Sequence, residues 1–186
     1  MRQKKSPPRV LSLFSGAGGL DLGLEAAGFE TRLCVEFDQD ARATLRVNRP
    51  RWTLATPGDI HKHEPADLLA QAELEAGEVE LLAGGPPCQP FSKSGYWSNG
   101  DSRRLRDPRA NTLRAYLDVV EAARPRVVLL ENVRGLAYAG KAEGLDLLAR
   151  SFQSINERHA TRYRLSVFHL NAADFGVPQF RERVFV

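Results

Sequence analysis

Residues 10–14 (VLSLF) form a short apolar run that passes directly into a glycine-rich stretch at residues 15–19 (SGAGG). Beyond it, Leu20, Leu24 and Ala27 recur at helical spacing. The order therefore predicts a buried strand, a tight turn and a helix, which is the opening unit of an α/β sheet.

The same alternation continues along the chain. Buried strands are predicted at 31–37, 80–83 and 126–130 (RVVLL), and helices at 38–49, 112–123 and 144–159, with Pro50 ending the first of these helices. Two further strands are expected at 163–170 and 183–186. Nearly continuous Val/Leu strands separated by helices favour a parallel sheet covered on both faces. We therefore predict a doubly wound, mostly parallel, Rossmann-like α/β fold.

Composition restricts the class of protein. The chain has 186 residues, 42% of them hydrophobic and 26% charged, with a net charge of +3, as in a soluble globular protein of one domain, here residues 1–186. No apolar run is long enough to span a bilayer and the N-terminus lacks a signal-peptide core, so we expect an intracellular protein. Two cysteines, Cys34 and Cys88, cannot make a disulfide framework.

Positive charge is unevenly placed. Residues 1–9 form a basic tail, and residues 93–109, a polar loop rich in arginine, are expected to be a mobile active-site element. Residues 61–80 are acidic, with six acids and one lysine. One basic face is expected. Because the last predicted strand ends while still apolar, we expect a truncated chain, an excised domain or one subunit of a split protein.

The glycine-rich turn suggests a ligand site. Glycines directly after a first strand let the backbone approach a ligand, and Glu36 follows Gly16 by 20 residues at the end of the second strand, where an acid can accept hydrogen bonds from ribose hydroxyls. The spacing differs from G-x-G-x-x-G, so a nucleoside-containing cofactor is favoured over a pyrophosphate. The alternative is a turn that only packs. Asp59 could accept a hydrogen bond from an adenine amino group, or it could cap a turn.

Cys88 lies in the run GGPPCQPFS (84–92), where two prolines would hold its thiol in a defined direction, as a nucleophile requires. The alternative is a structural cysteine, which is the role we assign to Cys34 within its apolar strand.

Glu131 directly follows RVVLL, at the sheet edge where α/β proteins bind ligands. A partly desolvated carboxyl group there could donate a proton, or it could merely cap the next turn. In the segment 179–183 (QFRER), a strand would place Gln179, Arg181 and Arg183 on one face, unless the arginines are surface ion pairs. His61 and His63 have no partner ligands nearby in the sequence, so we predict no metal site.

Taken in order, the segments 14–19 (FSGAGG), 36–38 (EFD), 58–60 (GDI), 85–92 (GPPCQPFS), 131–133 (ENV) and 179–183 (QFRER) closely resemble the successive motifs of the cytosine-C5 methyltransferases. The resemblance spans residues 10–186 and implies the fold of S-adenosylmethionine-dependent methyltransferases. Its catalytic residues would be Cys88, Glu131 and Arg183: Cys88 adds to C6 of cytosine, Glu131 interacts at N3, and Arg183 holds the O2 edge and orients Glu131.

The resemblance also implies binding residues. S-adenosylmethionine would be held by Phe14, Ser15, Gly16, Ala17, Gly18, Gly19, Glu36, Phe37, Asp59, Ile60, Gly85, Pro87 and Leu113. Double-stranded DNA, with the target base flipped out, would be contacted by Gln89, Ser92, Arg103, Arg104 and Arg181.

The resemblance stops before the family's target-recognition domain and closing helical segment, so a complementing subunit or a further C-terminal segment is expected. The expected setting is bacterial restriction-modification in the cytoplasm. The alternatives are a tRNA cytosine-C5 methyltransferase, a non-catalytic methyltransferase-like subunit and a nicotinamide-dependent dehydrogenase; hydride transfer explains neither PPCQPFS nor QFRER.

Overall fold

The computed structural model describes residues 6–87, 111–137 and 143–186. These residues form two compact units. Unit 1 comprises residues up to Gly84 together with Asp118–Val128, and unit 2 comprises Gly85–Leu117 and Leu129–Val186. No helix in the described ranges is long and apolar enough to cross a membrane.

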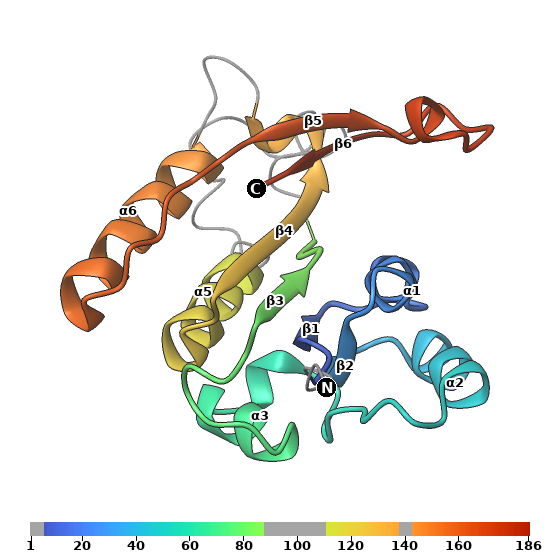
Figure 1. Cartoon of the computed structure of the whole chain (residues 1–186), viewed down its shortest axis with the longest axis horizontal. Coiled ribbons are helices and arrows are strands. Elements are labelled where there is room, and N and C mark those ends of the chain that lie inside the picture. The colour runs from blue at the N-terminus through green and yellow to red at the C-terminus, as the bar shows by residue number, and fades with distance from the viewer. Residues whose placement is uncertain (1–5, 88–110, 138–142) are drawn as a thin grey trace, which may run out of the picture. The chain divides into compact units, whose positions relative to one another are not determined.

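Unit 1 is built on three parallel strands in the order β2-β1-β3 (Figure 1). They are β1 (Arg9–Leu13), β2 (Glu30–Val35) and β3 (Leu81–Gly84). Leu11 of β1 pairs with Leu33 on one side and Leu82 on the other, and all three side chains are fully buried. From residue 49 to Asp59 the chain pairs with β2 only through an isolated parallel bridge between Leu54 and Cys34.

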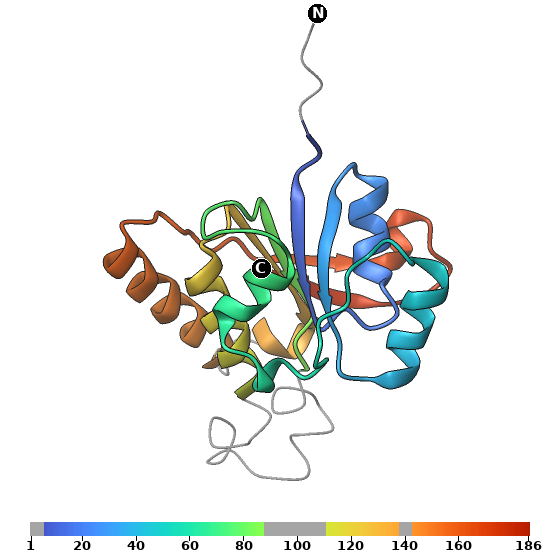
Figure 2. The same ribbon diagram turned by 90° about the horizontal axis from the view of Figure 1, so that it is seen from below.

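Helices cover both faces of these strands, as the doubly wound prediction requires. Figure 2 shows α1 (Gly19–Ala26) and α2 (Gln39–Asn48) on one face, with α3 (Pro65–Gln71) on the other. Neither α3 nor the short 3₁₀ helix η1 (Ile60–Lys62) was predicted from the sequence. The start of α2 is set by Asp38, whose side chain accepts a hydrogen bond from the Ala41 amide.

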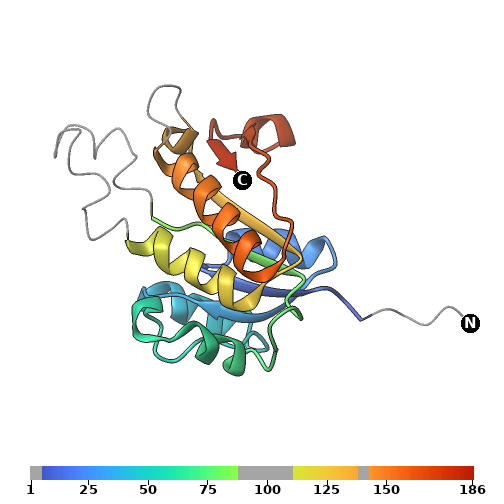
Figure 3. The ribbon, with the colours of Figure 1, turned by 90° about the vertical axis from the view of Figure 1, so that its left-hand side faces the viewer.

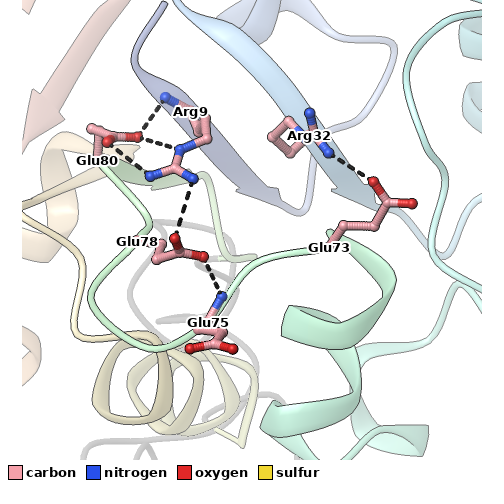
Figure 4. Close-up of polar contacts among 6 residues, drawn as sticks. All are labelled: Arg9, Arg32, Glu73, Glu75, Glu78 and Glu80. Atoms are coloured by element: carbon pink, nitrogen blue, oxygen red, sulfur yellow. Dashed lines mark hydrogen bonds and ion pairs between the residues drawn. The ribbon is translucent and has the colours of Figure 1, made fainter. Parts of the chain in front are cut away.

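Arg9, predicted to be part of the basic tail, is paired with two acids of the 61–80 segment (Figure 4). Its backbone N–H and its Nε donate to Glu80 Oε2 at 2.8 and 3.0 Å, and its Nη2 donates to Glu80 Oε1 at 3.2 Å. Glu78 lies 3.7 Å from its Nη1. Arg9 therefore ties the start of β1 to the segment before β3 and does not add to a basic surface; residues 1–5 lie outside the described ranges.

Unit 2 is built differently, because its strand pairings are antiparallel. It holds β4 (Val127–Val133) from Leu129 onward, followed by the 3₁₀ helix η4 (Arg134–Ala137), α6 (Glu143–His159), β5 (Phe168–Asn171), the 3₁₀ helix η5 (Ala172–Phe175) and β6 (Glu182–Phe185). The strand order is β4-β6-β5. The helix α5 (Asn111–Ala123) begins in this unit and ends in unit 1.

Two predicted boundaries were wrong. The strand expected at 163–170 begins only at Phe168, because residues 160–167 run back along α6 (Figure 3). There Asn156 accepts a hydrogen bond from the Tyr163 amide at 2.7 Å, and the rings of Phe152 and Tyr163 are 5.5 Å apart. The strand expected to end at Leu130 continues to Val133. Side-chain contacts with a helix thus replace strand pairing in the first case, and pairing with β6 extends the strand in the second.

Candidate functional site

In unit 1 the glycine-rich turn has a left-handed backbone at three positions. The φ angles are 56° at Phe14, 55° at Gly16 and 87° at Gly18. A bulky residue rarely adopts this region, so Phe14 is held there by its surroundings. A methyl group added at Gly18 would lie 2.9 Å from Leu45 Cδ2 and 3.3 Å from Trp52, which gives a second reason for glycine at this position.

Glu36 holds this turn from the end of β2. Its Oε2 accepts a hydrogen bond from the Gly16 amide at 2.6 Å, and its Oε1 accepts one from the Asp38 amide at 2.7 Å. Such short bonds are typical of an ionised acceptor. Each carboxylate oxygen has a second lone pair, so the same group can still accept bonds from a diol.

A buried polar cluster lies beneath the turn. The Ser12 and Ser15 hydroxyls are 2.9 Å apart, and Asp21 of α1 is fully buried. Burial raises the pKa of Asp21, and the Ser12 hydroxyl opposes this in part, although neither Asp21 oxygen makes a hydrogen bond of ordinary geometry within the described residues. Burial, followed by the nearby Asp21 charge, raises the pKa of Cys34 to about 12. Cys34 is therefore buried within its strand, as predicted for a structural cysteine.

The second acid predicted in unit 1, Asp59, caps a turn. Its Oδ1 accepts a hydrogen bond from the His61 amide at 3.1 Å, at the start of η1. The capping alternative is thus confirmed, while the adenine role stays a prediction. Of the other residues assigned to the cofactor, Phe37 is 71% exposed, Ala17 and Gly19 are exposed, and Ile60 is buried.

One residue beside the turn, Arg42, was not predicted from the sequence. It is 5% exposed and donates from Nη1 to the Glu36 carbonyl at 3.0 Å. The feature of the sequence that could have identified Arg42 is its spacing from apolar residues of the same helix. Arg42 stands three residues before the buried Leu45 on α2 and so shares its inward face.

In unit 2 the predicted acid and arginines do come together. Arg183 Nε lies 2.9 Å from Glu131 Oε1, and Arg181 Nη2 lies 3.7 Å from the same oxygen. The side chains of Glu131 and Arg183 are only 23% and 24% exposed. The arginines therefore form an ion pair, which was the alternative weighed for them, but their partner is the candidate catalytic acid itself.

Strand register explains this meeting. Glu131 is inside β4 and not beyond it, and it faces Phe185, while Val133 faces Arg183 two residues further along the antiparallel pair. Alternate residues of these strands point to opposite faces. Leu130, Asn132 and Val184 are buried on one face, whereas Glu131 and Arg183 lie on the other. Gln179 precedes β6 and is exposed.

Other predicted residues of unit 2 support this site from neighbouring loops. Asn132 Nδ2 donates to the Pro86 carbonyl at 3.1 Å, which connects the start of the PPC run to β4. A methyl group added at Gly85 would lie 3.2 Å from Glu131 Oε2. Pro87 is exposed and Leu113 is buried. Cys88, Gln89, Ser92, Arg103 and Arg104, with the loop 93–109, lie outside the described residues.

Comparisons with known proteins agree on one family. Residues 8–186 match the model of the C-5 cytosine-specific DNA methylases. The chain is 42% identical over 180 residues to the Type II methyltransferase M.AquIA of Picosynechococcus sp., covering 96% of this chain and 70% of that protein. It is 39% identical to the Type II methyltransferase M.SacI of Streptomyces achromogenes, covering 95% of this chain but 46% of that protein.

Solved structures share the fold. A DNA modification methyltransferase encoded within an E. coli prophage superposes with a TM-score of 0.72 at 27% identity, over 96% of this chain and 45% of that one. DNMT2 of Spodoptera frugiperda, at 23% identity and a TM-score of 0.64, is similar in fold. The chain thus spans less than half of M.SacI and of both of these proteins.

Proposed function

Because the chain belongs to the C-5 cytosine-specific DNA methylase family, we propose that it transfers a methyl group from S-adenosylmethionine to C5 of cytosine in double-stranded DNA. The observation that carries this proposal is the 2.9 Å pair of Glu131 and Arg183. A carboxyl group oriented by a guanidinium suits the adjacent N3 and O2 positions of a cytosine ring.

The glycine-rich turn suits the proposed cofactor. Glu36 is already fixed by two backbone amides and keeps acceptor capacity for ribose hydroxyls. Phe14 and Phe37 would pack against the adenine, and Asp59 would accept a hydrogen bond from the adenine amino group. The backbone of residues 15–19 would pass along the rest of the cofactor. Gly85, Pro87 and Leu113 are assigned to the same ligand. When bound, S-adenosylmethionine supplies an electrophilic methyl group.

The residues of unit 2 would activate the cytosine ring. In our proposal, the Cys88 thiolate adds to C6, which makes C5 nucleophilic, while Glu131 donates a hydrogen bond or proton to N3. Arg183 holds O2 and keeps Glu131 in place, so that charge entering the ring is stabilised. Once C5 has accepted the methyl group, loss of the C5 proton, return of any N3 proton to Glu131 and expulsion of the Cys88 thiolate would restore the aromatic ring and the free enzyme.

The proposed reaction also requires contacts with DNA. The target base must leave the duplex before its C5 can be reached. Arg103 and Arg104 would contact phosphates, a contribution that is sensitive to salt and independent of sequence. Gln89, Ser92 and Arg181 are assigned to the same DNA substrate.

We further propose that sequence recognition comes from a segment or subunit beyond residues 1–186, because the chain spans 46% of M.SacI and 70% of M.AquIA. Restriction-modification in a bacterial cytoplasm is the setting that the names of these relatives favour.

Trapping with 5-fluorocytosine tests the mechanism. DNA of mixed sequence in which all cytosines carry fluorine needs no known recognition site, and it cannot lose the C5 proton. With S-adenosylmethionine, the wild-type chain and Cys34→Ser should form an adduct that survives denaturing electrophoresis, and Cys88→Ala should form none. An adduct that persists in Cys88→Ala would contradict the mechanism, and an adduct that is missing from wild type even when the recognition segment or subunit is supplied would favour a non-catalytic subunit. The same assay with tRNA transcripts decides between the two polymers.

A further inference from the structure

The buried guanidinium of Arg42 lies between two parts of the proposed cofactor site. Its Nη1 donates to the backbone carbonyl of Glu36 at 3.0 Å. Gly58, which directly precedes Asp59, packs against the same two groups. A methyl group added at Gly58 would overlap the Glu36 carbonyl oxygen and would lie 2.5 Å from Arg42 Nη1. Arg42, Glu36 and Gly58 are thus in direct three-way contact.

Burial of this guanidinium needs a reason. A buried arginine is costly unless it is well paired, yet within the described part of the chain Arg42 forms no ion pair with a carboxylate. Its hydrogen-bond partner is a backbone carbonyl, so the residue restrains the path of the chain instead of neutralising an acid. A shorter or apolar side chain would leave the Glu36 carbonyl without this donor.

The restraint acts on both acids of the site. The Glu36 carbonyl belongs to the residue whose carboxylate holds the Gly16 and Asp38 amides. The Gly58 backbone leads into Asp59, whose carboxylate holds the His61 amide. Any shift of Arg42 would therefore change the spacing between the group proposed for the ribose and the group proposed for the adenine.

We propose that Arg42 is a positioning residue that sets the spacing of Glu36 and Asp59, and so determines affinity for the adenosine half of S-adenosylmethionine. This inference rests on the proposed function. Gly58 is its necessary partner, because any side chain there would separate the same two groups.

Binding measurements on the whole chain test this. Titration calorimetry with S-adenosylmethionine and with 5′-methylthioadenosine, which lacks the amino-acid half, should show Kd raised about tenfold for both ligands in Arg42→Met and Gly58→Ala, the loss expected for one misplaced hydrogen-bonding group. Arg42→Lys, which keeps a donor, should lose less. Arg46→Met removes an exposed arginine from the same helix and should bind like wild type.

Amide exchange in the ligand-free protein provides a second measurement. In Arg42→Met, but not in Arg46→Met, exchange at Gly16, Asp38 and His61 should accelerate relative to the amides of β1. Equal affinities together with unchanged exchange would overturn the inference, as would a loss confined to S-adenosylmethionine. If wild type bound neither ligand, the proposed function would fail, and the exchange data would still decide whether Arg42 positions the two acids.

Discussion

Replacement of Glu36 offers the sharpest test of the glycine-rich turn. The carboxylate makes two short hydrogen bonds, 2.6 Å to the Gly16 amide and 2.7 Å to the Asp38 amide. A hydrogen bond to a charged group contributes about 1.5 to 3 kcal/mol, and the partial exposure of Glu36 favours the lower figure. Glu36→Gln keeps one acceptor oxygen but turns an NH₂ group toward the other amide. It should therefore cost about 1.5 kcal/mol of unfolding free energy, and Glu36→Ala about 3 kcal/mol.

Urea unfolding followed by circular dichroism measures these differences. Glu64→Gln is the matched control, because Glu64 is exposed in the same unit and makes no side-chain hydrogen bond at the helix it precedes. Amide exchange should accelerate at both Gly16 and Asp38 in Glu36→Ala. Affinity for S-adenosylmethionine should fall at least tenfold in either Glu36 variant, because a ribose acceptor is lost or turned away. If Glu36→Ala unfolded within about 0.5 kcal/mol of wild type, the two bonds would not hold the turn, and the reasoning would be refuted.

Three further predictions concern the groups beneath and beside the turn. In a Cys88→Ser variant, iodoacetamide at pH 8 should alkylate Cys34 about a thousandfold more slowly in the folded protein than in the urea-unfolded chain. The reason is that a thiol with a pKa of about 12 has about a thousandfold less thiolate at this pH than a thiol with the ordinary value of 9.0. Comparable rates in the two states would contradict the burial of Cys34. Arg9→Met should lower the unfolding free energy by about 0.5 to 1 kcal/mol at pH 7. This difference from wild type should disappear as pH falls toward 3, because Arg9 lowers the pKa of Glu80 and the stabilisation is lost when Glu80 becomes protonated. A difference that does not change with pH would exclude the ion pair as its cause. Asp21→Asn should stabilise the protein at pH 8 by about 1 kcal/mol. Burial raises the pKa of Asp21, so wild type loses stability as pH rises through that pKa, and the variant does not. Urea unfolding at pH 5 and 8 should therefore show a smaller pH dependence in the variant, and an unchanged dependence would contradict this explanation.

Local pattern was sufficient for the elements that carry the site. The apolar run before SGAGG formed β1 and the helix after it formed α1, as predicted. Glu36 was expected within the end of the second strand and lies one residue beyond it, because β2 ends at Val35. These features depend on residues close together in the sequence, where apolar spacing and glycine conformations decide the backbone. Cys34 was predicted correctly for the same reason, because an unbroken apolar strand in an α/β protein is buried on both faces.

Register and long-range pairing could not be predicted in this way. The QFRER pattern placed Arg181 and Arg183 on one face, but only the antiparallel pairing of β4 with β6 brought them to Glu131. The pairing also extended β4 through Glu131, which the sequence had placed beyond the strand.

The sequence by itself determined the order of most strands and helices, the glycine-rich turn with its acid, and the family to which the chain belongs, because each depends on short motifs in a set order. Only the tertiary structure decided that Arg9 is paired with Glu80, that Asp21 is buried, and that Arg42 contacts Glu36 and Gly58. The physical reason is that burial and ion pairing arise where segments distant in sequence pack together, and no spacing within one segment records which neighbour it will meet.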